Sequence, residues 1–64
     1  MVQVRDVLEW LHEDGWRLTV IRGSHRQFTH PEKPGRVTVP GKPGDDLPPG
    51  TLASILKQAG ISKR

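Results

Sequence analysis

The sequence predicts an α+β fold of two layers in the order α-β-β-β-α, in which two helices cover one face of a three-stranded antiparallel sheet. Three observations lead to this expectation. Apolar residues recur at helical spacing near both ends of the chain, they alternate with polar residues in the middle, and glycine- and proline-rich segments separate these regions. Two layers bury both helical stripes against the sheet at once. The length of 64 residues fits one domain, which we place at 1–64.

The first helix is expected at about residues 3–14, and Gly15 provides its C-terminal stop. Its apolar stripe has the spacing i, i+3, i+4, i+7 and comprises Val4, Val7, Leu8 and Leu11. Strands are expected at about residues 16–21 and 25–30, where apolar and polar residues alternate. The segment 22–24 between them is expected to form a hairpin turn.

The length of the hairpin loop determines which side chains share a face of the sheet. With a two-residue turn, Phe28 would lie opposite Thr19, away from Leu18. With a three-residue loop, Ile21 faces His25 and Phe28 lies opposite Leu18 on the apolar face. We favour the three-residue loop, which places His25 on the face of the sheet that points away from the core.

The remaining elements follow two segments rich in proline and glycine. A turn at residues 31–35 precedes a short strand at 36–39, and residues 41–50 are expected to form a loop. A second helix follows, with its stop at Gly60 and Ile61. Its apolar stripe comprises Leu52, Ile55, Leu56 and Ala59. The expected core is Val4, Val7, Leu8, Leu11, Trp16, Leu18, Val20, Phe28, Val37, Val39, Leu52, Ile55, Leu56 and Ile61.

Charge and composition narrow the classes of function. The net charge is +3, and residues 16–42 carry six basic side chains against one acidic side chain, which favours a polyanionic partner such as nucleic acid. The chain has no cysteine, so thiol nucleophiles and thiolate metal sites are excluded. The histidine spacings match no metal-binding pattern. The acidic N-terminal segment does not resemble a signal peptide, and no apolar run could span a membrane. We therefore expect a cytoplasmic protein with no metal and no small-molecule cofactor.

Three histidines are the candidates for proton transfer near neutral pH. His12 lies among acidic residues on the polar side of the first helix and is interpreted as a solvated surface residue. His30 precedes Pro31 at a strand end, where a structural role is favoured. His25 follows Gly23 and Ser24 at the hairpin tip and is interpreted either as a catalytic residue or as part of a polar surface.

Several segments together resemble one known family. An amphipathic helix ending in DGW is followed in order by GSHRQF, VTVP and GTLASILKQAG. This arrangement resembles the HicA toxins, a YcfA-like family of mRNA interferases, over nearly the whole chain. The resemblance implies a fold like that of double-stranded-RNA-binding domains, cleavage of messenger RNA, a catalytic histidine at His25 and a neighbouring Gly23 needed for that geometry. It also implies a HicB-type antitoxin as partner.

The sequence departs from relatives at two places. Many relatives have a second histidine in the loop that follows VTVP, where this chain has Lys42, so a contribution from that position would be charge stabilisation. The second helix opens with Gly50 and Thr51 and lacks the basic cluster of ordinary duplex-RNA binders. Single-stranded message is therefore the expected substrate.

RNA carries its own nucleophile, the 2′-hydroxyl, so a metal-free enzyme needs only a proton acceptor and cations. His25 is the expected acid or base, and leaving-group protonation would fall to water or to His30. Residues expected to contact RNA are Arg22, Ser24, Arg26, Arg36 and Lys42, with the cations binding phosphate. Two alternative hypotheses for the function are a non-catalytic nucleic-acid binder of the same fold and a protein-interaction module.

Overall fold

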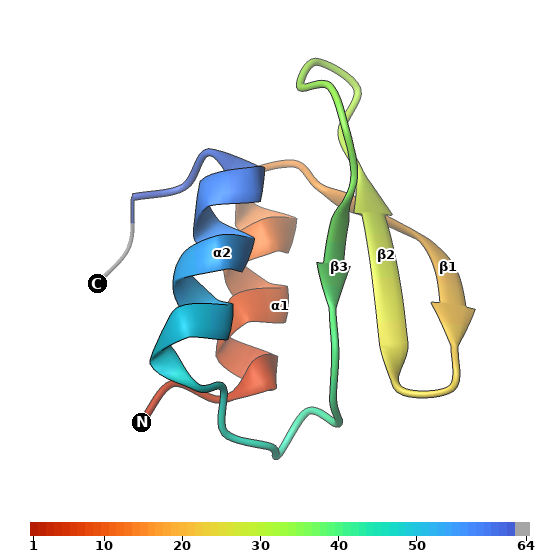
Figure 1. The fold of residues 1–64 in the computed structure, drawn as a ribbon. Helices are drawn as coiled ribbons and strands as arrows, with labels where there is room; N and C mark the ends of the chain where they lie inside the picture. Colours follow the sequence, from red (N-terminus) through yellow and green to blue (C-terminus); the bar gives the residue numbers. More distant parts are fainter. Residues whose placement is uncertain (63–64) are drawn as a thin grey trace.

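The computed structural model describes residues 1–62, which form two helices and three strands in the predicted order (Figure 1). The elements are α1 (Val4–Glu13), β1 (Arg17–Arg22), β2 (His25–Thr29), β3 (Val37–Val39) and α2 (Pro49–Ala59). The strands form one antiparallel sheet in the order β1-β2-β3. The α+β fold class is therefore confirmed. Neither helix in the described part of the chain is long and apolar enough to cross a membrane.

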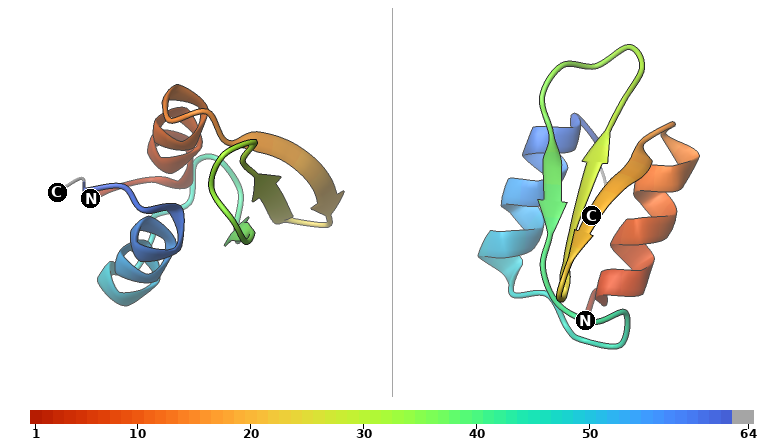
Figure 2. Two further views of the ribbon diagram at one scale, coloured as in Figure 1. Left: turned by 90° about the horizontal axis from the view of Figure 1, so that it is seen from above. Right: turned by 90° about the vertical axis from the view of Figure 1, so that its right-hand side faces the viewer.

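Both helices lie on the same side of the sheet, and their apolar stripes face it (Figure 2). Val4, Val7 and Leu11 of α1 are buried. Alternate residues of the sheet face them, because residues two apart on a strand point to the same side. The core cluster comprises Val4, Val7, Leu11, Trp16, Phe28, Val37, Val39, Leu47, Ile55 and Ala59, with Leu8, Leu52 and Ile61 partly buried beside it. Most of the predicted core is confirmed, including the last turn, where Ile61 N donates to Leu56 O after Gly60 in the left-handed conformation.

The hairpin between β1 and β2 has neither of the two registers that the sequence suggested. Arg22 pairs with His25, so the turn has two residues, and Ile21 pairs with Arg26. The prediction that Ile21 faces His25 is therefore wrong. Leu18 nevertheless pairs with Phe28 as predicted, because a β-bulge between Leu18 and Val20 takes up the extra residue.

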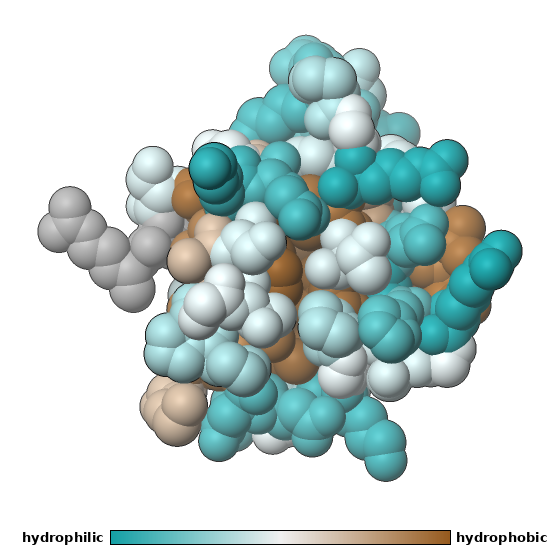
Figure 3. Space-filling view, in the orientation of Figure 1, coloured by the Kyte–Doolittle hydropathy of each residue, from teal (hydrophilic) through white to brown (hydrophobic). Residues whose placement is uncertain are grey.

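Strand β1 is exposed along its whole length. The prediction that Leu18 and Val20 belong to the core is wrong: they are 46% and 37% exposed, and Ile21 is 59% exposed. The strand is the edge of the sheet farthest from α2 (Figure 1). Its apolar side chains are accordingly less buried than Phe28 of β2 and Val37 of β3. Brown apolar atoms are accordingly visible beside this strand at the right of the space-filling view (Figure 3).

The loop before α2 is ordered by hydrogen bonds to the beginning of α1. The first backbone N–H groups of a helix have no partner within it. Here Val4 N donates to Asp45 O and Arg5 N donates to Pro43 O, each at 2.9 Å. Leu47, which the sequence placed in an open loop, is buried.

The boundary of α2 differs from the expected one. The loop was predicted to extend through residue 50, but the helix already begins at Pro49. Proline is favoured in a first helical turn, because its fixed φ suits the helix and its missing N–H would have no intrahelical partner there.

Candidate active site

The β1–β2 turn consists of Gly23 and Ser24 and places His25 at the first position of β2. Gly23 has φ +58, and no non-glycine residue among the described residues has a positive φ. A glycine with positive φ at the first of two central positions is typical of a type II′ turn, whose twist matches the flanking strands. A Cβ added at Gly23 would meet no atom within 4 Å, so the requirement for glycine is conformational. The conformation of this turn therefore favours glycine at position 23, and the catalytic role of Gly23 that the resemblance implies stays a prediction.

His25 points to the sheet face opposite the core. Residues paired across antiparallel strands share a face. His25 therefore lies on the face of Arg22, its partner, and two residues from Gln27, which pairs with Thr38. Phe28 and Val37, on the other face, are buried. The imidazole of His25 is exposed and has no hydrogen bond or ion pair within residues 1–62.

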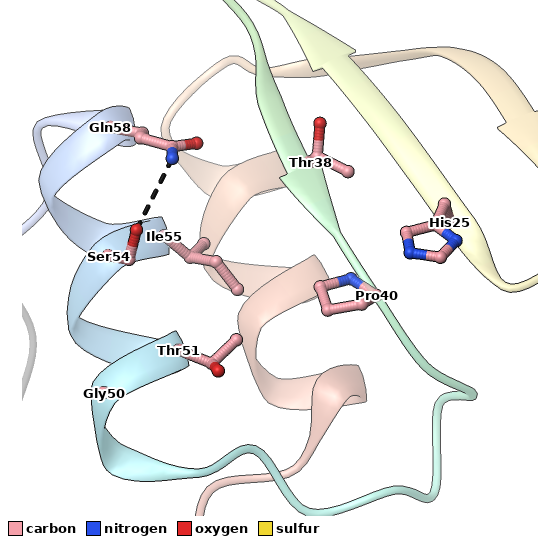
Figure 4. Close-up of a pocket in the computed structure, with 8 residues that line it drawn as sticks. All are labelled: His25, Thr38, Pro40, Gly50, Thr51, Ser54, Ile55 and Gln58. Atoms are coloured by element: carbon pink, nitrogen blue, oxygen red, sulfur yellow. Dashed lines mark hydrogen bonds between the residues drawn. The ribbon is translucent and has the colours of Figure 1, made fainter.

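A groove of about 440 Å³ runs from His25 across β3 to α2 (Figure 4). Thr38 and Pro40 lie between its two walls, and the far wall belongs to α2. The lining residues are His25, Thr38, Pro40, Gly50, Thr51, Ser54, Ile55 and Gln58. In the space-filling view this region is pale, with brown apolar atoms at its floor (Figure 3). The candidate histidine is therefore one wall of a concave surface.

The sequence analysis did not identify the wall from α2. A signal was present, because Thr51, Ser54 and Gln58 are uncharged polar residues at the spacing i, i+3, i+7. This spacing aligns side chains on one side of a helix.

The basic residues predicted to contact RNA differ in whether their side chains already form hydrogen bonds within the protein. Arg22 is exposed, shares the face of His25, and has no interaction within residues 1–62. Arg26 points to the other face, where its Nη1 donates to Gly41 O at 2.9 Å and ties β2 to the loop after β3. Arg36 Nη1 lies 3.4 Å from Gln27 Oε1, which is a weak hydrogen bond.

Ser24 and Lys42 lie in exposed loops. The backbone N–H of Lys42 donates to Asp45 Oδ2 at 2.9 Å, and Asp45 N donates to Lys42 O. This small turn is closed through the backbone, so the ammonium group of Lys42 has no hydrogen bond or ion pair within the described chain. Of the predicted cations, Arg22 and Lys42 are the two whose charged groups have no partner in the part of the chain that the structure describes.

His30 lies just beyond the opposite end of β2 and both of its ring nitrogens are engaged. Nδ1 accepts hydrogen bonds from Glu32 N and Lys33 N at 3.0 and 3.1 Å. Nε2 lies 2.7 Å from Asp14 O, so the proton belongs on Nε2, which donates to that carbonyl. The ring also contacts Trp16 edge to face.

These contacts assign His30 a structural role. Five residues of extended strand separate it from His25 by roughly 16 Å. It is therefore too far away to protonate a leaving group at His25, one of the two sources of that proton considered from the sequence. His12 is exposed on α1, as predicted.

An ion pair lies beside His30. Lys33 Nζ donates to Asp14 Oδ2 at 2.5 Å and to Ala59 O at 3.1 Å, which connects the turn after β2 to the ends of both helices. The hydrogen bond from Lys33 lowers the pKa of Asp14 below its ordinary value of 3.8. Within residues 1–62, no group of three or more His, Asp or Glu side chains is arranged to hold a metal ion.

Comparison with known families places the chain among bacterial toxins that act in toxin–antitoxin pairs. A family model described as the HicA toxin of bacterial toxin–antitoxin systems matches residues 4–61, a range that includes all five elements and the site. The chain belongs to the HicA toxin family, and the resemblance seen in the sequence is confirmed. A comparison with curated proteins finds no match.

Proposed function

We propose that this toxin is an endoribonuclease that cleaves messenger RNA in the cytoplasm through His25, without a metal ion. The observation that carries the proposal is the position of His25. Its exposed imidazole shares a face with the guanidinium of Arg22, neither group has a partner among residues 1–62, and His25 forms one wall of a groove. Family membership supports the toxic role. Imidazole is the side chain best suited to proton transfer at neutral pH.

The proposed reaction uses the 2′-hydroxyl of RNA as the nucleophile. His25 removes the proton of that hydroxyl, and the 2′ oxygen attacks the adjacent phosphorus. The bond from phosphorus to the 5′ oxygen breaks, and water supplies the proton that this oxygen takes up. The products are a 2′,3′-cyclic phosphate and a 5′-hydroxyl. With one proton-transfer residue at the site, we expect modest turnover.

Cations near His25 would stabilise the charge that develops on the phosphorane. Arg22 is the first candidate, because it is the cross-strand partner of His25 and its donors are free. A guanidinium offers two parallel N–H donors to phosphate oxygens. Arg36, Lys42 and the turn residue Ser24 are proposed as further contacts along the RNA backbone, whereas the contact of Arg26 with Gly41 O on the other face leaves Arg26 out of this set.

The proposal is tested by incubating the purified protein with single-stranded RNA in the presence of a chelator and identifying the ends of the products. We expect cyclic phosphate and 5′-hydroxyl ends, and no cleavage of RNA that carries a 2′-deoxy nucleotide at the scissile position. Salt-sensitive binding without cleavage would identify a non-catalytic nucleic-acid binder instead. Cleavage that requires an added divalent ion would contradict the metal-free mechanism.

The antitoxin partner is proposed to be a HicB-type protein that covers the face of His25. Covering that face blocks both the proposed base and Arg22. Because α1 carries acidic residues and the hairpin is basic, the two ends of the toxin present opposite fields that orient a partner, and association should be sensitive to salt. Hydrogen-exchange protection on binding should cover β2 and the hairpin turn. Protection confined to α1 would refute this placement.

A further inference from the structure

The groove beside His25 is lined by uncharged residues except at its histidine wall. None of the residues from β3 and α2 that line it is Lys, Arg, Asp or Glu. Arg22 lies on the hairpin beyond His25 and is not part of the lining. A phosphate group needs cations or several backbone donors. The walls from β3 and α2 supply no cation, and Ser54 and Gln58 lie beyond the first turn of α2, where a helix has free N–H groups. The part of a ligand that lies against Ser54 and Gln58 is therefore neutral.

The lining has the chemistry that recognises a nucleobase. The hydroxyls of Thr51 and Ser54 and the amide of Gln58 supply both donors and acceptors for a base edge, while Pro40 and Ile55 offer apolar surface to its faces (Figure 4). The volume of about 440 Å³ falls in the range of small-ligand sites. Single-stranded RNA presents such bases unpaired.

Gln58 is available for a ligand. Its Nε2 lies 3.5 Å from Ser54 Oγ, at the limit of a hydrogen bond, and both side chains are exposed. Such a long contact contributes little and is readily exchanged for a better partner. A glutamine amide can form two hydrogen bonds with one base edge, and a good pair of this kind discriminates strongly against other bases.

We propose that this groove binds the base of a nucleotide next to the phosphate at His25, and that Ser54 and Gln58 determine which base is accepted. The inference rests on the proposed function, because it assumes that RNA approaches His25. It adds a specificity site on α2 to the reaction assigned to the hairpin. The RNA backbone would follow the cationic side at Arg22, with one base turned across β3 toward α2.

The test measures base preference in two ways with the wild-type protein and with Ser54→Ala, Gln58→Ala and the double variant. First, a pool of random single-stranded RNA is cleaved and the ends are sequenced. Second, proteins select from a pool of random 2′-O-methyl RNA, which is not cleaved because the nucleophile is blocked. The wild type should favour particular bases at one position next to the scissile phosphate. Each variant should reduce that preference by roughly 5- to 150-fold.

Matched variants control for general effects on α2. Ala53 is exposed on the same helix and is not part of the groove lining. Ala53→Trp should therefore preserve binding and cleavage, whereas Ser54→Trp should fill the groove and reduce both. Circular dichroism melts establish that each variant folds, and the alanine variants provide the test if Ser54→Trp does not.

The outcomes separate this inference from the proposed function. A wild type that selects particular bases from the 2′-O-methyl pool but cleaves no RNA would refute the nuclease and retain the base site, provided that the double variant loses the selection. A double variant that keeps the wild-type preference would overturn the base site even if cleavage is normal. A wild type without any base preference in either pool would overturn it as well.

Discussion

Replacing His25 with alanine should separate catalysis from folding. His25 is exposed at the end of a strand, and its ring has no hydrogen bond within residues 1–62. Nothing buried is lost with the ring, so the free energy of unfolding should change by less than about 0.5 kcal/mol. Loss of a general acid or base should lower the cleavage rate by about 10² to 10⁴. RNA binding at neutral pH should persist, because Arg22 remains.

The other two histidines provide controls for this substitution. His12→Ala removes a second exposed imidazole and should change neither activity nor stability. His30→Ala removes the imidazole that holds the opposite end of the sheet and should affect stability. Cleavage of a labelled RNA is measured for all three variants across the pH range 5 to 8, alongside thermal melts.

The pH profile distinguishes proton transfer from a binding role. If His25 transfers a proton in the reaction, wild-type cleavage should change across this pH range, and the residual activity of His25→Ala should not follow the same change. Full activity in His25→Ala would refute the catalytic assignment. A His25→Ala protein that fails to fold would show that the exposed position of the ring is wrong.

Three further predictions follow from the charges and from His30. The logarithm of RNA affinity should fall by about 0.7 for each tenfold rise in salt concentration and each phosphate contact. Arg22→Gln should weaken binding to all RNA sequences alike and reduce that slope by the share of one contact. A change in base preference, measured by binding to a random pool, would instead mean that Arg22 contacts bases. His30→Ala should lower the free energy of unfolding by about 2 to 4 kcal/mol in a urea titration, because three hydrogen bonds are lost; unchanged stability would contradict the structural role. Because the pKa of Asp14 is lowered in the folded state, its carboxylate contributes to the free energy of unfolding at neutral pH, and this contribution is lost as the pH falls below about 3.8. An acid titration of Asp14→Asn should lack this loss of stability. An acid transition unchanged by the substitution would refute the role of the Lys33 contact.

The helices could be predicted closely because local spacing determines them. The stripe around Val7 and the stripe around Ile55 each have one arrangement that buries them, and glycine ends both helices. The misjudged boundary is the start of α2 at Pro49, inside the segment predicted as loop, where proline suits a first helical turn. The order of the preceding loop could not be predicted, because it depends on hydrogen bonds to N–H groups of α1, which lie far away in the sequence.

The hairpin shows where local rules are insufficient. Turn chemistry alone favours a two-residue turn at Gly23 and Ser24. The pairing of Leu18 with Phe28 requires one more residue between these two positions and the turn than a regular hairpin provides. The structure satisfies both conditions with a bulge at Thr19, whose hydroxyl donates to Gln27 O. A sequence does not show where such an extra residue is inserted. The prediction that His25 faces away from the core was nevertheless correct, because the pairing of Phe28 determines the faces of β2.

The sequence predicted the candidate site only on the hairpin side. His25 and Gly23 belong to one short motif, whereas the residues of α2 that line the groove begin at Gly50, 25 residues after His25. Only the packing of α2 beside β3 brings Ser54 and Gln58 to the same groove. No pattern in the sequence indicated that α2 packs beside β3 with these side chains turned toward His25.

The exposed edge of β1 also affects how the protein meets copies of itself. An uncovered strand with apolar side chains is a template for pairing with another chain. If two copies of β1 paired antiparallel with Leu18 opposite Ile21, Arg17 of each copy would lie opposite Arg22 of the other. Like charges placed directly across from each other oppose such pairing. Since dissolved ions shorten the reach of this repulsion from about 10 Å at 0.1 M to about 3 Å at 1 M, the arginines protect the edge best in dilute buffer. Arg17 and Arg22, at the two ends of β1, would therefore oppose edge-to-edge pairing of two copies at physiological ionic strength, where charges act over about 8 Å.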